Sequence, residues 1–397
     1  MSNSPSYPLA TATWDEAEYR AIQRVVDSGM FTMGSCVKEF EEKFAQYTGS
    51  QFCVMVNSGS SANLLMIAAL RYRKENSLSE GDEIIVPAVS WSTTYYPLQQ
   101  YGLKLKFVDI DRDTLNYDIR ALDEAVSENT RAIMVVNLLG NPNDFDAIAR
   151  IASTRNILVI EDNCESMGAC FNGRQAGTLG LLGSFSAFFS HHISTMEGGM
   201  VVTDDEELYH IMLSVRAHGW TRNLPKHNRL TGTKSDDAFV ESFKFVLPGY
   251  NLRPLEMSGA IGIEQLKKLP GLVSARRRNA VKFQGLMSDY PQLRTQKEIG
   301  ESSWFGFSMI VEPDAGFSRD DVVRVFTGHG IDVRPIVAGN FAKNDVLRWF
   351  DYNISGTLTN ADELDSNGLF IGNHHFDLDE QFDLLRSALD TLKQVSQ

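Results

Sequence analysis

The chain has 397 residues, a length typical of two or three domains, and 43% of these residues are hydrophobic, which is enough for a large core. Its formal net charge of -14, with lysines and arginines dispersed along the chain, argues against a surface that binds nucleic acid or an anionic membrane. Its four cysteines show neither CxxC spacing nor the density of a disulfide framework, so we expect reduced thiols and no zinc site.

The N-terminal part of the chain is predicted to be helical and to carry no targeting signal. No basic region precedes an apolar core there, and no apolar run in the chain approaches the roughly 18 residues that span a bilayer. We therefore expect a cytoplasmic protein without a membrane partner. Between Trp14 and Tyr47, apolar and acidic residues recur at three-to-four spacing, which predicts helices interrupted at residues 29–34.

A run of small residues follows the first predicted strand. Residues 52–56 are typical of a buried strand, residues 57–61 of a tight loop, and residues 62–70 of the helix into which this loop leads. Such a loop exposes backbone N–H groups and the positive end of a helix dipole, which suits a phosphate group. A plain strand-to-helix turn has the same pattern, so the loop alone leaves both interpretations open.

Short apolar runs then alternate with helical or polar segments. The elements predicted here are strands at 84–87, 105–108, 132–136 and 157–160, a polar aromatic segment at 90–96, a loop at 139–142 and a helix ending at 152. This alternation predicts an α/β fold with a mostly parallel sheet covered on both faces. Ligands bind such sheets at the carboxyl ends of the strands.

Glu161 and Asp162 come directly after the last of these strands. A carboxylate at that end of the sheet is semi-buried, and we expect it to need a cationic partner. For Asp162 taken alone, a capping or turn residue is the alternative interpretation.

The stretch at residues 184–200, SFSAFFSHHISTMEGGM, is the most informative in the chain. Alternating Phe and Ser predict a strand that ends at the pair His191 and His192, and Glu197 begins a Glu-Gly-Gly motif six residues after His191. A histidine at a strand end suits acid–base chemistry, whereas an isolated histidine is more typical of a packed core. We expect His192 to be structural and to orient its neighbour.

The rest of the chain predicts a hairpin return, a polar excursion and a smaller antiparallel α+β domain. The elements are a strand at 200–202, a helix from the acids at 204–207 to about 217, a polar excursion over 218–237, a helix from 256 to about 269, a long basic helix through 276–278, a strand at 304–311, a helix at 319–327, a strand at 331–334 and a final helix from about 379. We therefore predict a large domain over residues 1–265, which includes the N-terminal segment, and a smaller C-terminal domain over 266–397. His374 and His375 lack metal-ligand spacing, so we expect a packed or exposed loop pair.

The order of these features resembles the sugar-nucleotide aminotransferase family of the DegT/DnrJ/StrS type, from about Tyr7 to the last helix. The small-residue loop, the acid at a strand end, the Glu-Gly-Gly motif and a Gly-Tyr-Asn-x-Arg motif at 249–253 carry the resemblance. It implies the fold-type-I architecture of aspartate aminotransferase, with a large mostly parallel domain and a smaller α+β domain, and the cofactor pyridoxal 5'-phosphate (PLP). In that family a lysine six residues before Glu-Gly-Gly attaches the cofactor covalently. Here that position is His191, and no lysine occurs between Phe107 and Pro225.

This departure resembles a subgroup, the PLP-dependent sugar-nucleotide 3-dehydratases. It implies a lyase that holds PLP or pyridoxamine 5'-phosphate (PMP) non-covalently and uses L-glutamate as co-substrate. Residues 86–97 and 216–225 further imply the substrate GDP-4-keto-6-deoxy-D-mannose, on the route to a 3,6-dideoxy sugar such as colitose in lipopolysaccharide O-antigen. A related subgroup binds an iron–sulfur cluster through four cysteines in its later half; no cysteine follows Cys170, so we expect no cluster. An aminotransferase that uses another lysine and an inactive cofactor-binding regulatory module stay open as alternatives.

The resemblance also implies roles for residues at the reacting end of the cofactor. His191 is the catalytic acid–base group. Asp162 pairs with the pyridinium nitrogen, and Trp91 stacks on the ring. Glu165 contacts the side of the ring that carries the 3-hydroxyl. No metal ion is implied.

A second set of residues is implied for the phosphate of the cofactor. This set consists of the backbone N–H groups of Gly59 and Ser60, the hydroxyl of Ser186, and Asn251. Because the residue that matches Asn251 comes from the neighbouring subunit in related enzymes, the resemblance implies a homodimer with a shared active site. His218 and Arg222 are either contacts of the substrate diphosphate or parts of a surface loop.

Overall fold

The computed structural model describes residues 6–395, so residues 1–5 of the N-terminal stretch lie outside the described part of the chain. Its centre is an eight-stranded sheet in the order β1, β9, β8, β5, β4, β2, β3, β14. The strands are β1 (Phe52–Val56), β2 (Glu83–Pro87), β3 (Lys104–Val108), β4 (Thr130–Val136), β5 (Leu158–Asp162), β8 (Leu182–Ser186), β9 (Gly199–Thr203) and β14 (Tyr352–Ile354). Only β9 runs antiparallel to its neighbours, so the expected mostly parallel α/β sheet is confirmed.

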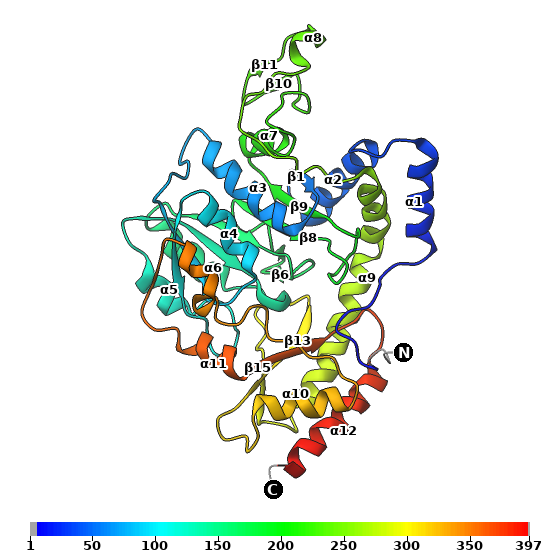
Figure 1. The fold of residues 1–397 in the computed structure, drawn as a ribbon, viewed down its shortest axis with the longest axis vertical. Helices are drawn as coiled ribbons and strands as arrows, with labels where there is room; N and C mark the ends of the chain where they lie inside the picture. Colours follow the sequence, from blue (N-terminus) through cyan, green and yellow to red (C-terminus); the bar gives the residue numbers. More distant parts are fainter. Residues whose placement is uncertain (1–5, 396–397) are drawn as a thin grey trace.

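Helices cover both faces of this sheet (Figure 1). One face packs with α3 (Gly59–Tyr72), α4 (Ser92–Gln100) and α7 (Glu206–Val215), and the other with α2 (Ser35–Thr48), α5 (Ile119–Ala125), α6 (Phe145–Ser153) and α9 (Glu256–Met287). The first helix, α1 (Glu16–Ser28), lies against α9 and ends at Gly29, whose left-handed backbone favours glycine. No helix within residues 6–395 combines the length and apolar character needed to cross a bilayer.

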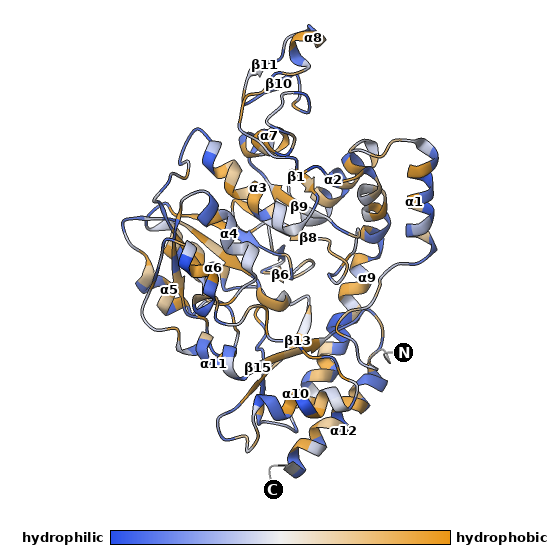
Figure 2. Ribbon diagram, viewed as in Figure 1, coloured by the Kyte–Doolittle hydropathy of each residue, from blue (hydrophilic) through white to orange (hydrophobic). Residues whose placement is uncertain are grey.

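Because successive side chains of a strand point to opposite faces of the sheet, each strand contributes to the hydrophobic cores on both faces. Val54 and Val56 of β1 pack in the same cluster as Leu65 of α3, whereas Cys53 and Met55 point to the other face and join Phe40 of α2. Figure 2 shows the consequence: α3, buried between the sheet and α7, is largely hydrophobic, whereas the outer helix α1 mixes hydrophobic and hydrophilic residues.

A single helix, α9, spans a region for which two helices were predicted. It has 32 residues, so the prediction of a helix end near Leu269 is wrong. Pro270 lies inside α9 and lacks a backbone donor, but Leu269, Leu272 and Val273 around it are buried in the core. Burial of these side chains outweighs the local cost of the proline, because tertiary packing overrides helix propensity.

The smaller lobe, at the bottom of Figure 1, is antiparallel α+β as predicted. Its elements are the strands β12 (Leu293–Thr295), β13 (Gly306–Val311) and β15 (Gly368–Gly372) and the helices α10 (Arg319–Gly328) and α12 (Asp379–Val395). The strand predicted at 331–334 does not form. Ile331 bridges to Tyr7 and Arg334 bridges to Phe370, so the two ends of the segment bond to different parts of the chain and no ladder develops.

Two elements connect the predicted domains. Helix α9 runs through residue 265, and β14 returns from the C-terminal part to pair with β3 of the large sheet. The division into residues 1–265 and 266–397 stays a prediction. The remaining short elements are β6 (Cys170–Phe171), β7 (Arg174–Gln175), α11 (Thr359–Asn367) and the 3-10 turns Leu138–Gly140, Phe341–Lys343 and Asp345–Trp349.

The polar excursion predicted after residue 218 projects from the body of the molecule as an arm, at the top of Figure 1. It contains β10 (His227–Asn228), β11 (Gly232–Thr233) and α8 (Ala238–Glu241). Phe239 and Phe243 on this arm are exposed. Exposed aromatic side chains of this kind are typical of contact surfaces.

The histidine pair near the C-terminus is packed. The ring of His374 is buried, with Nε2 2.9 Å from the carbonyl oxygen of Pro8 and Nδ1 3.1 Å from Oγ1 of Thr11. These contacts fasten the N-terminal segment to the smaller lobe. The expectation of a packed loop pair is confirmed for His374, and His375 is half-buried beside it.

Candidate active site

A cavity of about 530 Å³ opens at the carboxyl ends of β4, β5 and β8. On the other side it is bounded by Phe305, Arg334 and Phe370 of the smaller lobe. Seven of the eight site residues predicted from the sequence line it, namely Gly59, Ser60, Trp91, Asp162, Glu165, Ser186 and His191. This is the place where ligands bind in open α/β sheets.

Asp162 is the last residue of β5 and its carboxylate is buried at the floor of the cavity. Its Oδ2 accepts hydrogen bonds from Asn63 Nδ2 and Thr94 Oγ1, both at 2.8 Å, and its Oδ1 accepts the N–H of Cys164 at 3.1 Å. All three donors are neutral, so the cationic partner expected from the sequence is not supplied by the described chain. A buried carboxylate held in this way fits the protonated ring nitrogen of PLP.

Glu161, the other acid of the pair, faces away from the cavity. Its carboxylate accepts backbone N–H groups from Gly177 at 2.6 Å, Leu179 at 2.7 Å and Gly180 at 2.6 Å. Burial raises the pKa of Glu161, and these hydrogen bonds oppose that effect. For Glu161 the expected cationic partner is wrong, because backbone N–H groups of one loop take its place.

The N-terminus of α3 forms one end of the cavity. Ser58 caps the helix by accepting the N–H of Ser61, which leaves Gly59 and Ser60 in its first turn. A Cβ at position 59 would lie 2.6 Å from Cβ of Ser186, so only glycine allows β8 and α3 to approach this closely. Backbone N–H groups, a helix dipole and the Ser186 hydroxyl together suit a phosphate, which is one of the two interpretations that the loop left open.

Trp91 precedes α4 at the mouth of the cavity, and its side chain is 59% exposed. An exposed indole on a cavity wall offers a flat apolar face to a ring bound next to it.

Replacing Gly59 with Ala is expected to destabilise the cofactor-free protein by about 1–3 kcal/mol, because the added methyl group overlaps Ser186. Urea denaturation measures this change. Gly271→Ala is the matched control, since a Cβ there meets no atom within 4 Å, and a gain of roughly 0.5–1 kcal/mol is expected inside a helix. A Gly59→Ala protein as stable as the parent would contradict the close approach of β8 and α3.

His191 lies in the loop after β8, where its backbone N–H donates to the carbonyl of Phe188 at 2.9 Å. Its ring stands edge-on to the rings of Phe188 and Phe305, with centroid distances of 6.0 and 5.3 Å. Its Nδ1 is buried and has no hydrogen-bond partner in the described chain. Burial lowers the pKa of His191 to about 4, although the Ser186 backbone and the charge of Asp162 act in the opposite direction. The imidazole is therefore neutral at neutral pH and free to accept a proton.

His192 lies behind the cavity wall and is fully buried. Its Nε2 lies 3.2 Å from the carbonyl oxygen of Ser303, and burial holds its pKa well below the usual range. This placement agrees with the structural role predicted for it.

Glu165 lines the cavity next to Asp162 and accepts the N–H of Leu139 at 3.0 Å. Leu139 has a φ of 52°, a conformation that residues with a side chain rarely adopt, and it brings this N–H to the carboxylate. Burial raises the pKa of Glu165 to about 7; the Leu139 N–H lowers it and the charge of Asp162 adds to the rise. A carboxyl group poised near neutrality fits a partner that alternates between hydroxyl and oxyanion, such as the 3-hydroxyl of PLP.

Asn251, the eighth predicted residue, lies outside the cavity of its own chain. Its side chain is exposed and its Oδ1 accepts Arg253 Nε at 2.9 Å. His218 and Arg222 lie near it at the base of the arm, where Arg222 stacks 4.4 Å above the ring of Trp220. The ligand contacts of Asn251, His218 and Arg222 stay predictions, and a surface loop stays the alternative for His218 and Arg222.

Several residues of the site were not predicted. The sequence contains only a weak indication of Asn63 and Thr94, which donate hydrogen bonds to Asp162. Asn63 lies in the helix predicted after the small-residue loop, and Thr94 lies in the polar aromatic segment. Phe305 and Arg334 come from the smaller lobe and carried no motif. Arg334 is the only cation among the residues that line the cavity in the described chain, and its Nη1 donates to its neighbouring carbonyl at Val333.

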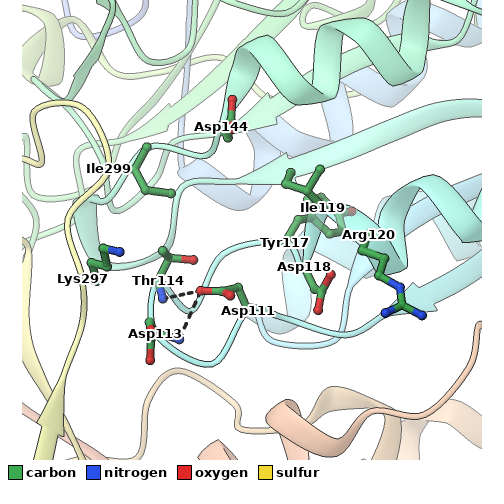
Figure 3. A pocket seen from close by; sticks show the side chains of 10 residues that line it. All are labelled: Asp111, Asp113, Thr114, Tyr117, Asp118, Ile119, Arg120, Asp144, Lys297 and Ile299. Carbon is green, nitrogen blue, oxygen red and sulfur yellow. Dashed lines mark hydrogen bonds between the residues drawn. The ribbon is translucent and has the colours of Figure 1, made fainter.

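A second cavity, of about 360 Å³, is lined by acids near α5 (Figure 3). Its carboxylates serve local structure: Asp111 accepts two backbone N–H groups of its own turn, Asp118 caps α5 and Asp144 caps α6. No group of three His, Cys, Asp or Glu side chains within residues 6–395 is arranged to hold a metal ion.

The chain was compared with known proteins. The model of the DegT/DnrJ/EryC1/StrS aminotransferase family matches residues 12–383. GDP-4-keto-6-deoxy-D-mannose 3-dehydratase of Escherichia coli O55:H7 is 63% identical over 385 residues, which cover 97% of this chain and 99% of that protein. Two solved structures of GDP-4-keto-6-deoxymannose-3-dehydratase, a variant with bound GDP-perosamine and an enzyme with a trapped PLP–glutamate geminal diamine, each have a TM-score of 0.96 at 63% identity and cover 97% of this chain and 100% of theirs.

The sequence resemblance is thus confirmed over nearly the whole chain, and the fold-type-I architecture with it. Seven of the eight residues that the resemblance assigns to the cofactor or to catalysis line the cavity at the carboxyl ends of the strands, and His191 is among them. From the family match, the relatives and the architecture together, we conclude that the chain belongs to the DegT/DnrJ/EryC1/StrS aminotransferase family.

Proposed function

We propose that this protein is a lyase that removes the 3-hydroxyl group of GDP-4-keto-6-deoxy-D-mannose, with PLP and PMP as cofactor forms and L-glutamate as co-substrate. The observation that carries the proposal is His191, which lines the cavity beside Asp162 at the position of the family's lysine. No lysine lines this cavity in the described chain. The substrate is supported by the relative that is 63% identical and named for this reaction.

The chain holds the cofactor by non-covalent contacts. PLP, when bound, supplies an electron sink that stabilises negative charge on the carbon attached to its ring. Asp162 keeps a proton on the ring nitrogen, and Trp91 covers one face of the ring. The N-terminus of α3, with Gly59 and Ser60, binds the phosphate dianion through backbone N–H groups.

His191 moves the proton. Its neutral imidazole would accept a proton from the cofactor carbon that carries the amino group of PMP, and the bound cofactor would supply the electron sink for loss of the 3-hydroxyl group. The protonated ring then donates the same proton to that hydroxyl, which leaves as water. Histidine cannot bond covalently to the cofactor as lysine does, so the dehydrated sugar would leave with the amino nitrogen that PMP received from glutamate. Hydrolysis of this amino sugar by one water molecule would give a 3-deoxy-4-keto sugar and ammonia.

The active site is proposed to be shared between two copies of the chain in a cytoplasmic homodimer. Asn251 is assigned to the cofactor phosphate but lies outside the cavity of its own chain, and a second copy would supply it. The exposed Phe239 and Phe243 on the neighbouring arm support a contact there. The product would enter the route to a 3,6-dideoxy sugar such as colitose in lipopolysaccharide O-antigen.

The proposal is tested by incubating the protein with PLP, L-glutamate and GDP-4-keto-6-deoxymannose. We expect 2-oxoglutarate, ammonia and a sugar product that has lost one oxygen atom, measured by mass spectrometry. Treatment of the PLP-loaded protein with borohydride is expected to leave no covalent adduct. A stable adduct would instead indicate an aminotransferase that uses a lysine, and no 2-oxoglutarate would indicate an inactive cofactor-binding module.

A further inference from the structure

A buried arginine without a carboxylate partner lies behind the catalytic histidine. Arg276 of α9 is only 5% exposed, and no ion pair of the described chain includes it. Its Nη1 donates to the carbonyl oxygens of Phe305 at 3.0 Å and Asn373 at 2.5 Å, whereas its buried Nε has no partner. Burial of an uncompensated charge is costly, so its presence calls for an explanation beyond stability.

The carbonyl that Arg276 holds belongs to a strained segment of the cavity wall. Trp304 has a φ of 49°, in the left-handed region that bulky side chains avoid. The segment is fixed to the large lobe by hydrogen bonds from the N–H of Ser303 to Gly140 at 2.9 Å and from the N–H of Phe305 to Leu139 at 3.0 Å. Arg276 therefore fastens the wall from the side opposite to the large lobe.

Phe305 connects this anchor to the histidine. Its ring centroid lies 5.3 Å from that of His191 at 84°, and 5.7 Å from that of His192 at 49°. Since Nδ1 of His191 has no hydrogen-bond partner in the described chain, packing against Phe305 helps to orient the imidazole, together with contacts to the backbone of Ser186 and Cys164. A shift of the Phe305 backbone would therefore disturb that orientation.

We propose, on the basis of the proposed function, that Arg276 is a positioning residue for proton transfer by His191. Through Phe305 it fixes the orientation of the imidazole, and its uncompensated positive charge disfavours the protonated ring. The imidazole is therefore unprotonated before proton transfer begins. Once it has taken its proton, it releases that proton readily to the departing hydroxyl group.

The electrostatic surroundings of His191 support this role. The titratable and charged groups around it are Asp162 at the end of β5, Cys164 and Glu165 after it, Glu197 in its own loop, His192 beside it, Arg334 across the cavity and Arg276 on α9. Burial is the largest effect on the pKa of His191 and lowers it; the charge of Asp162 raises it and that of Arg276 lowers it. Loss of the arginine would remove one of the effects that lower the pKa of His191, so this pKa would rise.

The test compares Arg276→Gln, which removes the charge, with Arg276→Lys, which keeps it. Histidine ring protons are titrated by NMR in the cofactor-free protein, with the His191 signal assigned from the His191→Asn spectrum. We expect Arg276→Gln to raise the titration midpoint of His191 by about 1 pH unit and Arg276→Lys to leave it unchanged. Arg278→Gln removes the same charge from the exposed side of α9 and is the matched control.

An unchanged midpoint in Arg276→Gln, or an equal rise in Arg278→Gln, would overturn the electrostatic part of the proposal. The NMR titration needs no turnover, so its outcome does not depend on the proposed function. The proposed function would be overturned if the parent protein released no ammonia from GDP-4-keto-6-deoxymannose in the presence of PLP and L-glutamate.

Phe305→Leu tests whether Phe305 orients the imidazole of His191, and it changes no charged residue. This test remains possible if the Arg276 variants fold poorly. We expect kcat to fall about tenfold with little change in KM, because the imidazole loses its orientation. The His191 ring signals should move as the neighbouring ring current is lost, with an unchanged midpoint. An unaltered kcat in this variant would overturn the positioning role.

Discussion

Replacing His191 with Asn is expected to lower the rate of dehydration by about 10³-fold while PLP stays bound. Asparagine fills much of the same space but cannot accept and return a proton. The groups assigned to the cofactor, Asp162 and the N-terminus of α3, remain in place. Turnover is measured as ammonia released from GDP-4-keto-6-deoxymannose in the presence of glutamate, and bound PLP by its absorbance.

His329→Asn is the matched control for this substitution. His329 follows α10 in the smaller lobe, where its Nδ1 lies 2.8 Å from the carbonyl oxygen of Val325, and it does not line the cavity. We expect it to retain the activity of the parent. Undiminished dehydration in the His191→Asn protein would refute the assignment of the acid–base group.

The second large effect is expected at Asp162. Asp162→Asn should weaken PLP binding by about 10²–10³-fold, because a charge-assisted contact with the protonated ring nitrogen is lost. The amide oxygen still accepts hydrogen bonds from Asn63 and Thr94, but the amide N–H₂ then faces the N–H of Cys164. Removal of a buried charge without a cation in the described chain offsets that loss, so the free energy of unfolding of the cofactor-free protein should change little. PLP titration followed by fluorescence and urea denaturation measure the two quantities.

The adjacent acid, Glu161, provides a control in which the expected effects on stability and on PLP affinity are reversed. Glu161→Gln should cost about 2 kcal/mol of stability without cofactor, because an amide N–H₂ would then face backbone N–H groups of the loop that includes Gly177 and Gly180. It should leave PLP affinity nearly unchanged, since Glu161 faces away from the cavity. If Asp162→Asn lost stability as Glu161→Gln does, while keeping its affinity for PLP, the assignment of Asp162 to the cofactor would be wrong.

Local patterns predicted those elements whose sequence and surroundings agree. Strand β1 and the small-residue loop before α3 were predicted because hydrophobic alternation and glycine placement act over a few residues. The helix end near Leu269 and the strand at 331–334 were wrong, since distant packing decided both. In the first case a buried face overrode a proline, and in the second the partners of Ile331 and Arg334 lie in different parts of the chain.

The sequence by itself determined the chemistry that the site offers. A histidine stands six residues before Glu-Gly-Gly and no lysine lies between Phe107 and Pro225, and these are properties of the covalent chain that no fold alters. They exclude covalent attachment of the cofactor at this position.

Only the tertiary structure decided which distant residues meet around the cavity. Asn63 and Thr94 meet Asp162, and Arg276 meets Phe305, because α3, α4 and α9 pack around one end of the sheet. None of these contacts follows from residue spacing. The expected cation beside Asp162 is absent from the described chain for the same reason: packing supplied neutral donors, and it placed the buried positive charge behind His191 instead.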